Sequence, residues 1–218
     1  VKSGITTLVG TLGTDTVSRS LTTLLIKTKA LNLCGLKAFI YTGSVLFPPK
    51  TLTGSVEGDV ALINEVIGVK TGLGETVFPR PDLRELENLI TETRRASSLS
   101  GKQAVVHIHL AASAQDWIQA IESILEAREL PYPLVVLTHV NRSSRLLERS
   151  LAYAKKGGRI DLTTCVRPPE RPDAVKPSTA LQRYLETGGP PENITFSSDS
   201  NASRILANGV VNYTRVDT

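Results

Sequence analysis

The residues best suited to chemistry in this sequence are its three histidines, together with one lysine and one aspartate. His107 and His109 stand in the phrase Val-Val-His-Ile-His-Leu, and His139 stands in Leu-Thr-His-Val-Asn-Arg. Lys70 follows the apolar run Val-Ile-Gly-Val, and Asp199 follows Ile-Thr-Phe-Ser-Ser. All five therefore lie at or near the end of a short apolar run that is typical of a buried strand. If these ends meet, their imidazole and carboxylate groups would form a divalent-metal site suited to zinc.

The spacing leaves structural interpretations of the same residues open. A histidine at a strand end is often only a hydrogen-bonded structural residue, although the same placement of all three histidines keeps metal binding equally open. A lysine at a strand end can extend to solvent; alternatively, the Lys70 amine can add carbon dioxide and become an anionic carbamate that bridges two metals. His107 and His109 are two residues apart and point to the same side of the strand. His109, nearer the end, is the better ligand, and His107 is expected to pack or to support it.

The elements that must position these residues alternate along the chain. Short apolar runs rich in β-branched residues predict strands at 5–10, 36–42, 66–70, 104–110, 134–139, 159–163 and 194–198. Amphipathic stretches between them predict helices at 16–33, 81–97, 114–129, 143–156 and 178–186. This alternation predicts an α/β fold with a parallel sheet and right-handed crossovers. Seven such strands, with no glycine-rich phosphate loop after any of them, favour a (β/α)8 barrel with seven of its eight strands, whose chemistry lies at the carboxyl ends of the strands.

The composition argues against several classes of protein. The chain has 218 residues, a net charge of +4 and only 5% aromatic residues, and its charges alternate in sign. A nucleic-acid interface would need clustered basic residues with aromatic residues between them, so no nucleic-acid partner is expected. No apolar run approaches the roughly 18 residues of a membrane span, so no membrane partner is expected. Cys34 and Cys165 form no Cys-x-x-Cys pattern, which predicts free thiols and a cytoplasmic protein.

Short phrases spread over the chain resemble a known family when they are taken together. They are GITTLVGTLGTD (4–15), TLTGSV (51–56), VIGVK (66–70), VVHIHL (105–110), THVNR (138–142), KKGGRIDLT (155–163) and SSDSNAS (197–203). In this order they resemble the isoaspartyl (β-aspartyl) dipeptidase family of the metal-dependent amidohydrolases. The resemblance implies a TIM-like amidohydrolase barrel, of which residues 1–218 would form one partial domain with strands two to eight.

The resemblance also implies a binuclear zinc site. By motif, Lys70 corresponds to the N-carboxylated lysine that bridges the two Zn2+ ions. His109 and His139 correspond to the histidines that hold one of the metals. Asp199 corresponds to the aspartate that binds the other metal and moves the proton.

The substrate implied by the resemblance is a small β-aspartyl (isoaspartyl) dipeptide. Thr14, Arg142 and Ser203 fall on substrate-binding positions, and Arg142 suits this task because a guanidinium grips a carboxylate with two hydrogen bonds. In the implied reaction a metal-bridging hydroxide attacks the side-chain amide carbonyl, and Asp199 passes the proton to the leaving amine. The family resemblance further implies a homo-oligomer.

Three departures from the family pattern keep other functions open. The family's first-strand His-x-His and the glutamate after it have no counterpart, and the chain begins at Val1 without any methionine, so we expect it to be part of a longer polypeptide. The family tyrosine that stabilises the oxyanion falls on Val45. The family arginine after the lysine falls on Val77, with Arg80 nearby. The alternatives are an inactive or specificity-altered pseudoenzyme of the same fold, and a cyclic-amide hydrolase resembling dihydroorotase or hydantoinase.

Overall fold

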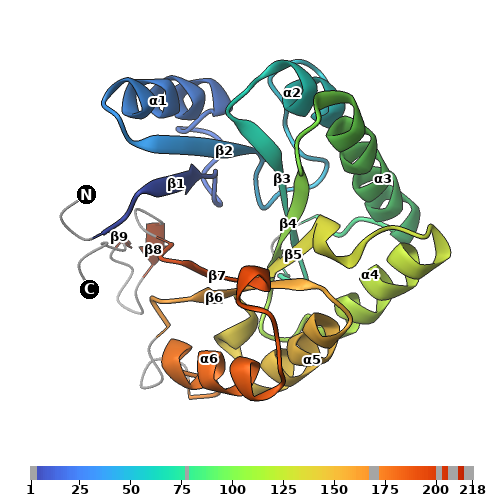
Figure 1. Ribbon diagram of the computed structural model, residues 1–218. Helices are drawn as coiled ribbons and strands as arrows, with labels where there is room; N and C mark the ends of the chain where they lie inside the picture. The colour runs from blue at the N-terminus through green and yellow to red at the C-terminus, as the bar shows by residue number, and fades with distance from the viewer. Residues whose placement is uncertain (1–3, 77–78, 167–171, 200–202, 206–210, 214–218) are drawn as a thin grey trace. The chain divides into compact units, whose positions relative to one another are not determined.

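Strands and helices alternate through the computed structural model, which describes residues 4–76, 79–166 and 172–199, and the backbone at 203–205 and 211–213 (Figure 1). The strands of its main sheet are β1 (Thr7–Gly10), β2 (Lys37–Gly43), β3 (Val66–Leu73), β4 (Val105–Leu110), β5 (Val135–Thr138), β6 (Arg159–Thr163) and β7 (Ile194–Ser197). The α-helices are α1 (Leu21–Leu33), α2 (Val56–Leu62), α3 (Leu83–Ser100), α4 (Gln115–Ala127), α5 (Ser144–Lys155) and α6 (Pro177–Glu186). Single 3-10 turns are η1 (Tyr132–Leu134), η2 (Val140–Arg142) and η3 (Pro191–Asn193). None of these described helices is both long and apolar enough to cross a membrane.

The main sheet has its strands in sequence order, from β1 to β7. The registers are parallel: Leu8 of β1 lies opposite Ala38 of β2, and Leu162 of β6 lies opposite Phe196 of β7. A separate antiparallel pair is formed by β8 (Ser203–Ile205) and β9 (Val211–Tyr213). Seven parallel strands in sequence order, interleaved with helices, are the arrangement of a partial (β/α)8 barrel. The predicted fold class is therefore confirmed.

The chain divides into two compact units. Unit 1 comprises Val1–Gly72 and Val77–His107, and unit 2 comprises Leu73–Thr76 and Ile108–Thr218. Strand β4 contributes to both units, so His107 belongs to unit 1 and His109 belongs to unit 2. The single partial domain expected over residues 1–218 stays a prediction.

In unit 1 the helices pack on β2 and on each other. Helix α1 lies along β2, and α2 packs against α3 (Figure 1). Helix α3 begins with a capping box, in which the Asp82 side chain accepts from the Glu85 N–H and the Glu85 side chain accepts from the Asp82 N–H. It ends at Gly101, which has a left-handed conformation. Apolar side chains that are buried in this unit include Ile40, Val60, Val69, Leu86 and Ile90.

A lysine amine closes the carboxyl end of α2 in unit 1. Lys102 Nζ donates to the carbonyls of Val60 and Ile63 at 2.7 Å and to that of Val66 at 3.1 Å. The Val60 and Ile63 carbonyls lie at the carboxyl end of α2, where helix carbonyls lack partners in the helix itself, and the Val66 carbonyl belongs to the first residue of β3. Desolvation lowers the pKa of Lys102, and the negative charge of Glu65 opposes this shift. A cation therefore fixes the connection between α2 and β3.

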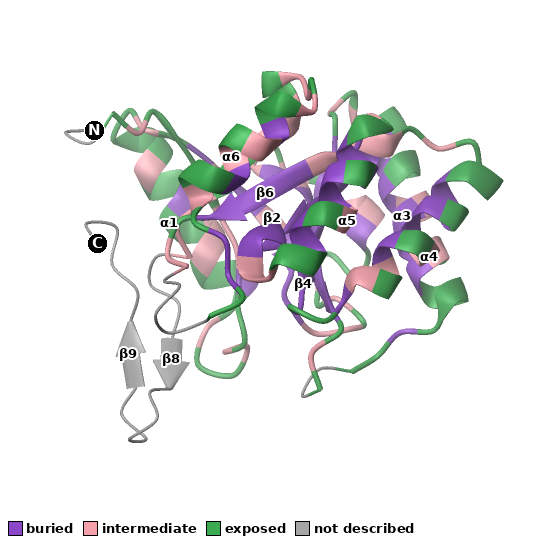
Figure 2. Ribbon diagram, turned by 90° about the horizontal axis from the view of Figure 1, so that it is seen from below, coloured by how far each residue is buried: buried purple, intermediate pink, exposed green. Residues whose placement is uncertain are grey.

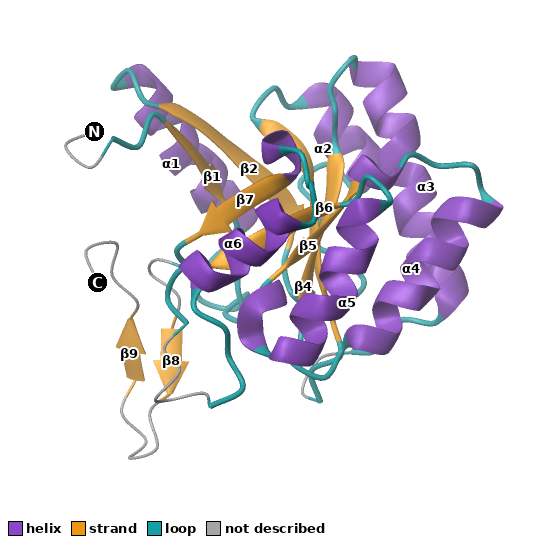
Figure 3. Ribbon diagram, turned by 60° about the horizontal axis from the view of Figure 1, so that its bottom comes forward, coloured by secondary structure: helices purple, strands orange, loops and turns teal. Residues whose placement is uncertain are grey.

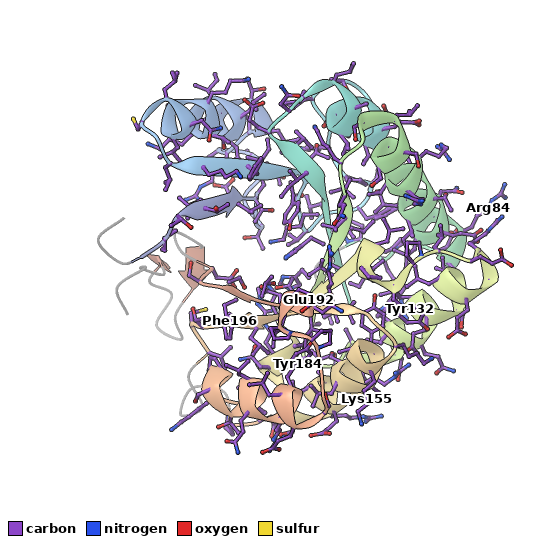
Figure 4. All side chains as sticks on the ribbon, in the orientation of Figure 1. Arg84, Tyr132, Lys155, Tyr184, Glu192 and Phe196 are labelled. Carbon is purple, nitrogen blue, oxygen red and sulfur yellow. The ribbon has the colours of Figure 1, made fainter. Side chains whose placement is uncertain are left out.

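In unit 2 the strands β5 and β6 are buried, and β7 is partly exposed. Strand β6 is buried, whereas the outward faces of α4 and α5 are exposed (Figure 2), and α5 and α6 lie beside β6 (Figure 3). Tyr184 reaches from α6 to the segment before β7, where its hydroxyl donates to the Pro190 carbonyl at 2.8 Å (Figure 4). Buried apolar side chains of this unit include Ile118, Ile121, Leu125, Leu137, Leu146 and Leu162.

Among the predicted boundaries that differ from the structure are the start of the first helix and the end of the third strand. The first helix was predicted from residue 16 but begins at Leu21, after the N-cap Ser20. The reason is local: the Asp15 carboxylate accepts from the N–H groups of Val17 and Ser18, which holds these residues in a turn. The third strand was predicted to end at Lys70 but continues to Leu73.

Candidate active site

Two imidazoles meet at the carboxyl ends of β4 and β5 in unit 2. His109 lies next to the last residue of β4, His139 directly follows β5, and both side chains are buried. Their ring centroids are 4.6 Å apart and the ring planes make an angle of 76°. His139 has a φ of 67°, a left-handed conformation that few non-glycine residues adopt, and η2 begins directly after it. The structure thus brings together the two histidines predicted to share one metal.

His139 is held through its Nδ1 atom. This atom is in hydrogen-bond contact with Thr163 Oγ1 on β6, and it lies 3.6 Å from Asp199 Oδ2. When Nδ1–H donates to the Thr163 hydroxyl, Nε2 carries the lone pair that a metal requires. The predicted proton carrier Asp199 therefore lies beside His139, one of the other predicted metal ligands.

A cation and an anion complete the cluster around His109. Arg142 Nη1 is 3.0 Å from His109 Nε2 and 3.5 Å from Glu75 Oε1. Glu75 Oε1 is itself 3.3 Å from His109 Nε2. Arg142 Nη2 is 3.9 Å from Asp199 Oδ2, so the guanidinium lies between two carboxylates. Arg142, a predicted substrate-binding residue, shares one cluster with His109 and Asp199.

A buried carboxylate joins the strands that carry this cluster. Asp161 on β6 is 3% exposed, and it accepts hydroxyl hydrogen bonds from Thr138 and Ser197 at 2.6 Å and from Thr195 at 2.8 Å. Burial raises the pKa of the Asp161 carboxyl, and the three hydroxyl donors oppose that shift. Thr138 immediately precedes His139. The carboxylate of Asp161 therefore links β5 and β7 to β6. His139 and Asp199 follow shortly after these two strands.

The turn after β5 is fastened to β6 by an asparagine. Asn141 is 0% exposed, and its Nδ2 donates to the carbonyls of Thr163 at 3.1 Å and Val175 at 3.0 Å. Its Oδ1 accepts from the Thr163 N–H at 2.8 Å. Because Asn141 lies between His139 and Arg142, these bonds fix the backbone from which both side chains project.

Other predicted site residues lie in unit 1. Lys70 is 4% exposed inside β3, which argues against the interpretation of a lysine that extends to solvent. His107 is also buried and stacks on Tyr41, with ring centroids 4.8 Å apart, as expected for a packing role. Thr14 is exposed in the segment between β1 and α1.

Of the two family positions that differ in this sequence, Val45 and Val77, the first lies in the described part of the chain. Val45 is 2% exposed in the loop after β2, so an apolar side chain is buried where the family pattern has a hydroxyl donor. Arg80 is exposed. Val77 and the side chain of Ser203 lie outside the described residues.

The donor types in unit 2 fit zinc. In the part of the chain that the structure describes, no group of three or more histidine, cysteine, aspartate or glutamate side chains could hold a metal ion by itself. Two imidazoles beside a carboxylate are nevertheless ligands that zinc takes in hydrolytic sites. His109, His139 and Asp199 supply these ligand types within unit 2.

Sequence reasoning missed Glu75, Asp161 and Thr163 as parts of this site. Glu75 stands in the glycine-rich segment Gly-Leu-Gly-Glu, which shows no periodicity. Asp161 and Thr163 lie in a predicted strand, and a charged residue between the apolar residues Ile160 and Leu162 was the available signal for Asp161. Buried carboxylates need partners, so this position could have been marked as part of a polar network.

Comparisons with known proteins agree with the geometry. No family model matches the chain. The structure is similar to β-aspartyl dipeptidase from Fervidobacterium islandicum AW-1 in complex with β-Asp-Leu dipeptide, with 36% identity, a TM-score of 0.87 and 99% of this chain covered. A second structure of β-aspartyl dipeptidase from that organism has 38% identity, a TM-score of 0.83 and 92% of this chain covered.

This chain corresponds to about half the length of the two dipeptidase chains. The chain spans 56% and 53% of the two dipeptidase chains. The phosphotriesterase homology protein of Escherichia coli shares 14% identity at a TM-score of 0.59, with 90% of this chain and 68% of that chain covered, which shows a common fold alone. Because the dipeptidase similarity extends over nearly the whole chain at more than a third identity, this chain belongs to the β-aspartyl dipeptidase family.

Proposed function

We propose that the chain carries part of a zinc-dependent site that hydrolyses β-aspartyl dipeptides. The observation that carries this proposal is the cluster of His109, His139, Arg142 and Asp199 at the strand ends of unit 2. The similarity to a dipeptidase crystallised with β-Asp-Leu supports a substrate of this class. The activity, the substrate and the homo-oligomer are proposals for the protein as a whole.

In this proposal Arg142 binds a substrate carboxylate. Its guanidinium side chain is 13% exposed, so little ordering entropy is lost when a ligand arrives. The neighbouring Asn141 anchors the backbone, which sets the direction from which the guanidinium approaches. A planar guanidinium in a fixed position can grip a carboxylate with two parallel hydrogen bonds. Thr14 and Ser203 are proposed as further substrate-binding residues.

Four residues are metal ligands in this proposal. His109 and His139 would hold one Zn2+, Asp199 would hold a second, and Lys70 would be a further ligand after N-carboxylation. When bound, the metal supplies Lewis acidity toward the amide carbonyl and a lowered pKa for the attacking water. Asp199 would accept a proton from the attacking water and pass it to the leaving amine. The Thr163 hydroxyl is in contact with Nδ1 of His139, which would leave Nε2 available as a metal ligand.

Zinc content and turnover together test the proposal. Purified protein is supplied with zinc and bicarbonate, and bound zinc is measured by elemental analysis in the wild type, Lys70→Ala and Lys155→Ala. Lys155 is an exposed helix residue (Figure 4) and serves as the control. We expect bound zinc that is lost only in Lys70→Ala, with hydrolysis of β-Asp-Leu but not of α-Asp-Leu. Protein without zinc and without turnover would show that the proposal is wrong.

A second candidate function is a family member with weakened or altered activity. Val45 favours it, because a buried valine at the position of the family's oxyanion donor offers no hydrogen bond. Loss of one such donor typically lowers kcat by about 10²–10³-fold. A kcat for β-Asp-Leu close to that of the Fervidobacterium relative, measured side by side, would exclude this candidate. Faster turnover of dihydroorotate or hydantoin than of the dipeptide would instead indicate a cyclic-amide hydrolase.

A further inference from the structure

A buried carboxylate in unit 1 holds the β2–α2 loop, residues 44–55. Asp59 on α2 is 0% exposed. Its oxygens accept from the Leu52 N–H at 3.0 and 2.9 Å and from the Thr53 N–H at 2.7 Å. The Thr53 hydroxyl donates to the same carboxylate at 2.8 Å, and the Thr42 hydroxyl near the end of β2 is also in hydrogen-bond contact with it. Asp59 therefore ties the loop both to the strand before it and to the helix after it.

Gly58 allows this loop to pack directly on α2. A Cβ atom at this position would collide with the Thr53 hydroxyl and would come within 3.0 Å of Ser55 Oγ. Ser55 is the N-cap of α2, and its hydroxyl accepts from the Gly58 N–H at 2.9 Å. Glycine lowers the helical propensity of a short helix, but here it leaves the space in which Thr53 reaches Asp59.

The β2–α2 loop starts beside Lys70. Gly43, the last residue of β2, lies opposite Lys70 in the register of β2 and β3. Gly43 has a φ of 78°, and a Cβ atom there would collide with the Lys70 carbonyl oxygen and come within 2.9 Å of Pro49 Cβ. The loop returns to this point at Lys50, whose carbonyl accepts from the Gly43 N–H at 3.0 Å. Residues 44–50 thus form a closed turn at the level of Lys70.

We propose that Asp59 is a positioning residue that keeps the β2–α2 loop closed over Lys70, so that the lysine amine stays enclosed for N-carboxylation. Carboxylation of Lys70 belongs to the proposed function, on which this inference therefore rests. In that step Nζ forms a bond to the carbon of carbon dioxide and releases one proton. The step is reversed when a solvent proton returns to the nitrogen and the C–N bond breaks. Lys70 is 4% exposed, and such enclosure keeps solvent protons away from Nζ.

Loss of the Asp59 carboxylate should raise the population of an open loop. In Asp59→Asn the amide oxygen still accepts from one backbone N–H, but the charged acceptor for the other donors is lost. Hydrogen bonds to a charged group are strong enough for this loss to shift a local opening equilibrium by about 10–100-fold. Solvent would then reach Lys70 more often while the rest of unit 1 stays folded.

Acetylation of Lys70 by acetic anhydride measures this opening. The protein is free of metal and bicarbonate, and peptide mass spectrometry compares Lys70 with the exposed Lys155 in the same sample. We expect wild-type Lys70 to react at least about 100-fold more slowly than Lys155, and Asp59→Asn to raise the Lys70 rate by about 10–100-fold. Gly58→Ala displaces the Thr53 hydroxyl and leaves the carboxylate in place, so it tests the same contact if Asp59→Asn does not fold.

Asp82→Ala is the matched control for a general loss of stability. It removes the N-cap of α3 in the same unit and should leave the acetylation of Lys70 unchanged. An equal acceleration in Asp82→Ala would overturn the inference, because opening would then follow stability alone. A Lys70 rate equal to that of the wild type in those of the two loop variants that fold would overturn it as well.

Zinc loading at different bicarbonate concentrations separates this inference from the proposed function. The bicarbonate concentration that gives half-maximal zinc content should rise about 10-fold in Asp59→Asn and stay at the wild-type value in Asp82→Ala. Faster acetylation with an unchanged bicarbonate requirement would mean a merely structural role for Asp59 and overturn the inference while the proposed function stands. Wild-type protein that binds no zinc would refute the proposed function, whereas the acetylation rates would still decide whether Asp59 keeps Lys70 enclosed.

Discussion

Replacement of Asp161 by alanine probes how the strand ends of unit 2 are held together. The carboxylate accepts hydrogen bonds from Thr138 on β5 and from Thr195 and Ser197 on β7. Alanine removes all three acceptor contacts and also the cost of burying a charge. The expected change in the free energy of unfolding is the balance between these two effects.

The balance is set by the hydroxyl groups that lose their acceptor. Thr138 is fully buried, and a buried donor without a partner costs about 1–3 kcal/mol. Thr195 and Ser197 are less buried and can turn toward water, so each adds less than about 1 kcal/mol. We therefore expect Asp161→Ala to lower the free energy of unfolding by about 2–4 kcal/mol, and Asp161→Asn to lower it by less because the amide oxygen still accepts.

Urea denaturation followed by circular dichroism at several pH values measures these changes. Burial raises the pKa of Asp161 above its ordinary value of 3.8, so the folded state keeps the proton to a higher pH than the unfolded state does. The contribution of Asp161 to stability is then full below about pH 3.8 and is lost as the pH rises through the raised pKa. The stability of Asp161→Asn relative to wild type should accordingly improve between pH 4 and neutrality, by an amount on the order of 1 kcal/mol per unit of pKa shift.

Two results would refute this reasoning. Unfolding of Asp161→Ala within about 0.5 kcal/mol of the wild type, the range of an ordinary surface substitution, would mean that the hydroxyl groups do not depend on the carboxylate. A difference between Asp161→Asn and wild type that stays constant with pH would mean that Asp161 does not change its protonation between the folded and unfolded states.

Three further substitutions test other parts of the structure. Lys102→Met leaves the carbonyls at the end of α2 without their donor and should cost about 1–3 kcal/mol in urea denaturation; an unchanged midpoint would contradict this role. Gly74→Ala forces a Cβ into contact at a positive φ and should lower the melting temperature, with a cost of about 1–3 kcal/mol; a melting temperature equal to that of the wild type would count against the close packing. Arg142→Lys loses the pair of hydrogen bonds that a guanidinium can donate to a carboxylate, and it should raise KM for β-Asp-Leu by about 10–100-fold with zinc content unchanged. A change in kcat alone would show that Arg142 does not bind the substrate carboxylate.

The strands could be predicted because their patterns are local. Each apolar run, such as Val-Ile-Gly-Val before Lys70, falls on a strand of the main sheet, and the order of the runs is the order of the strands in the sheet. Helix α2 was missed for an equally local reason: it has only seven residues and contains Gly58, which weakens the helical pattern. Its formation depends on tertiary contacts, namely packing on α3 and the bonds from Lys102.

The candidate site could be predicted only where a residue type itself indicates chemistry. His109, His139, Arg142 and Asp199 were chosen on residue type, motif and position, and the structure places them in one cluster. Glu75 could not be found in this way, because its position beside Arg142 depends on a turn that packs segment 73–76 against the residues before α4. Side-chain hydrogen bonds between strands that are far apart in the chain cannot be predicted from one sequence alone.

The buried amide of Asn141 has a consequence for how the protein can be produced. Asn141 begins an Asn-Arg-Ser sequence, which is an acceptor for N-linked glycans. Both hydrogen atoms of its Nδ2 are already used inside unit 2, so a sugar attached before folding would remove one bond and introduce a bulky polar group where no solvent reaches. A secretory expression host would therefore convert part of the chains into a form that cannot fold. Ser143→Asp would abolish the acceptor sequence and still offer a side-chain oxygen to cap α5.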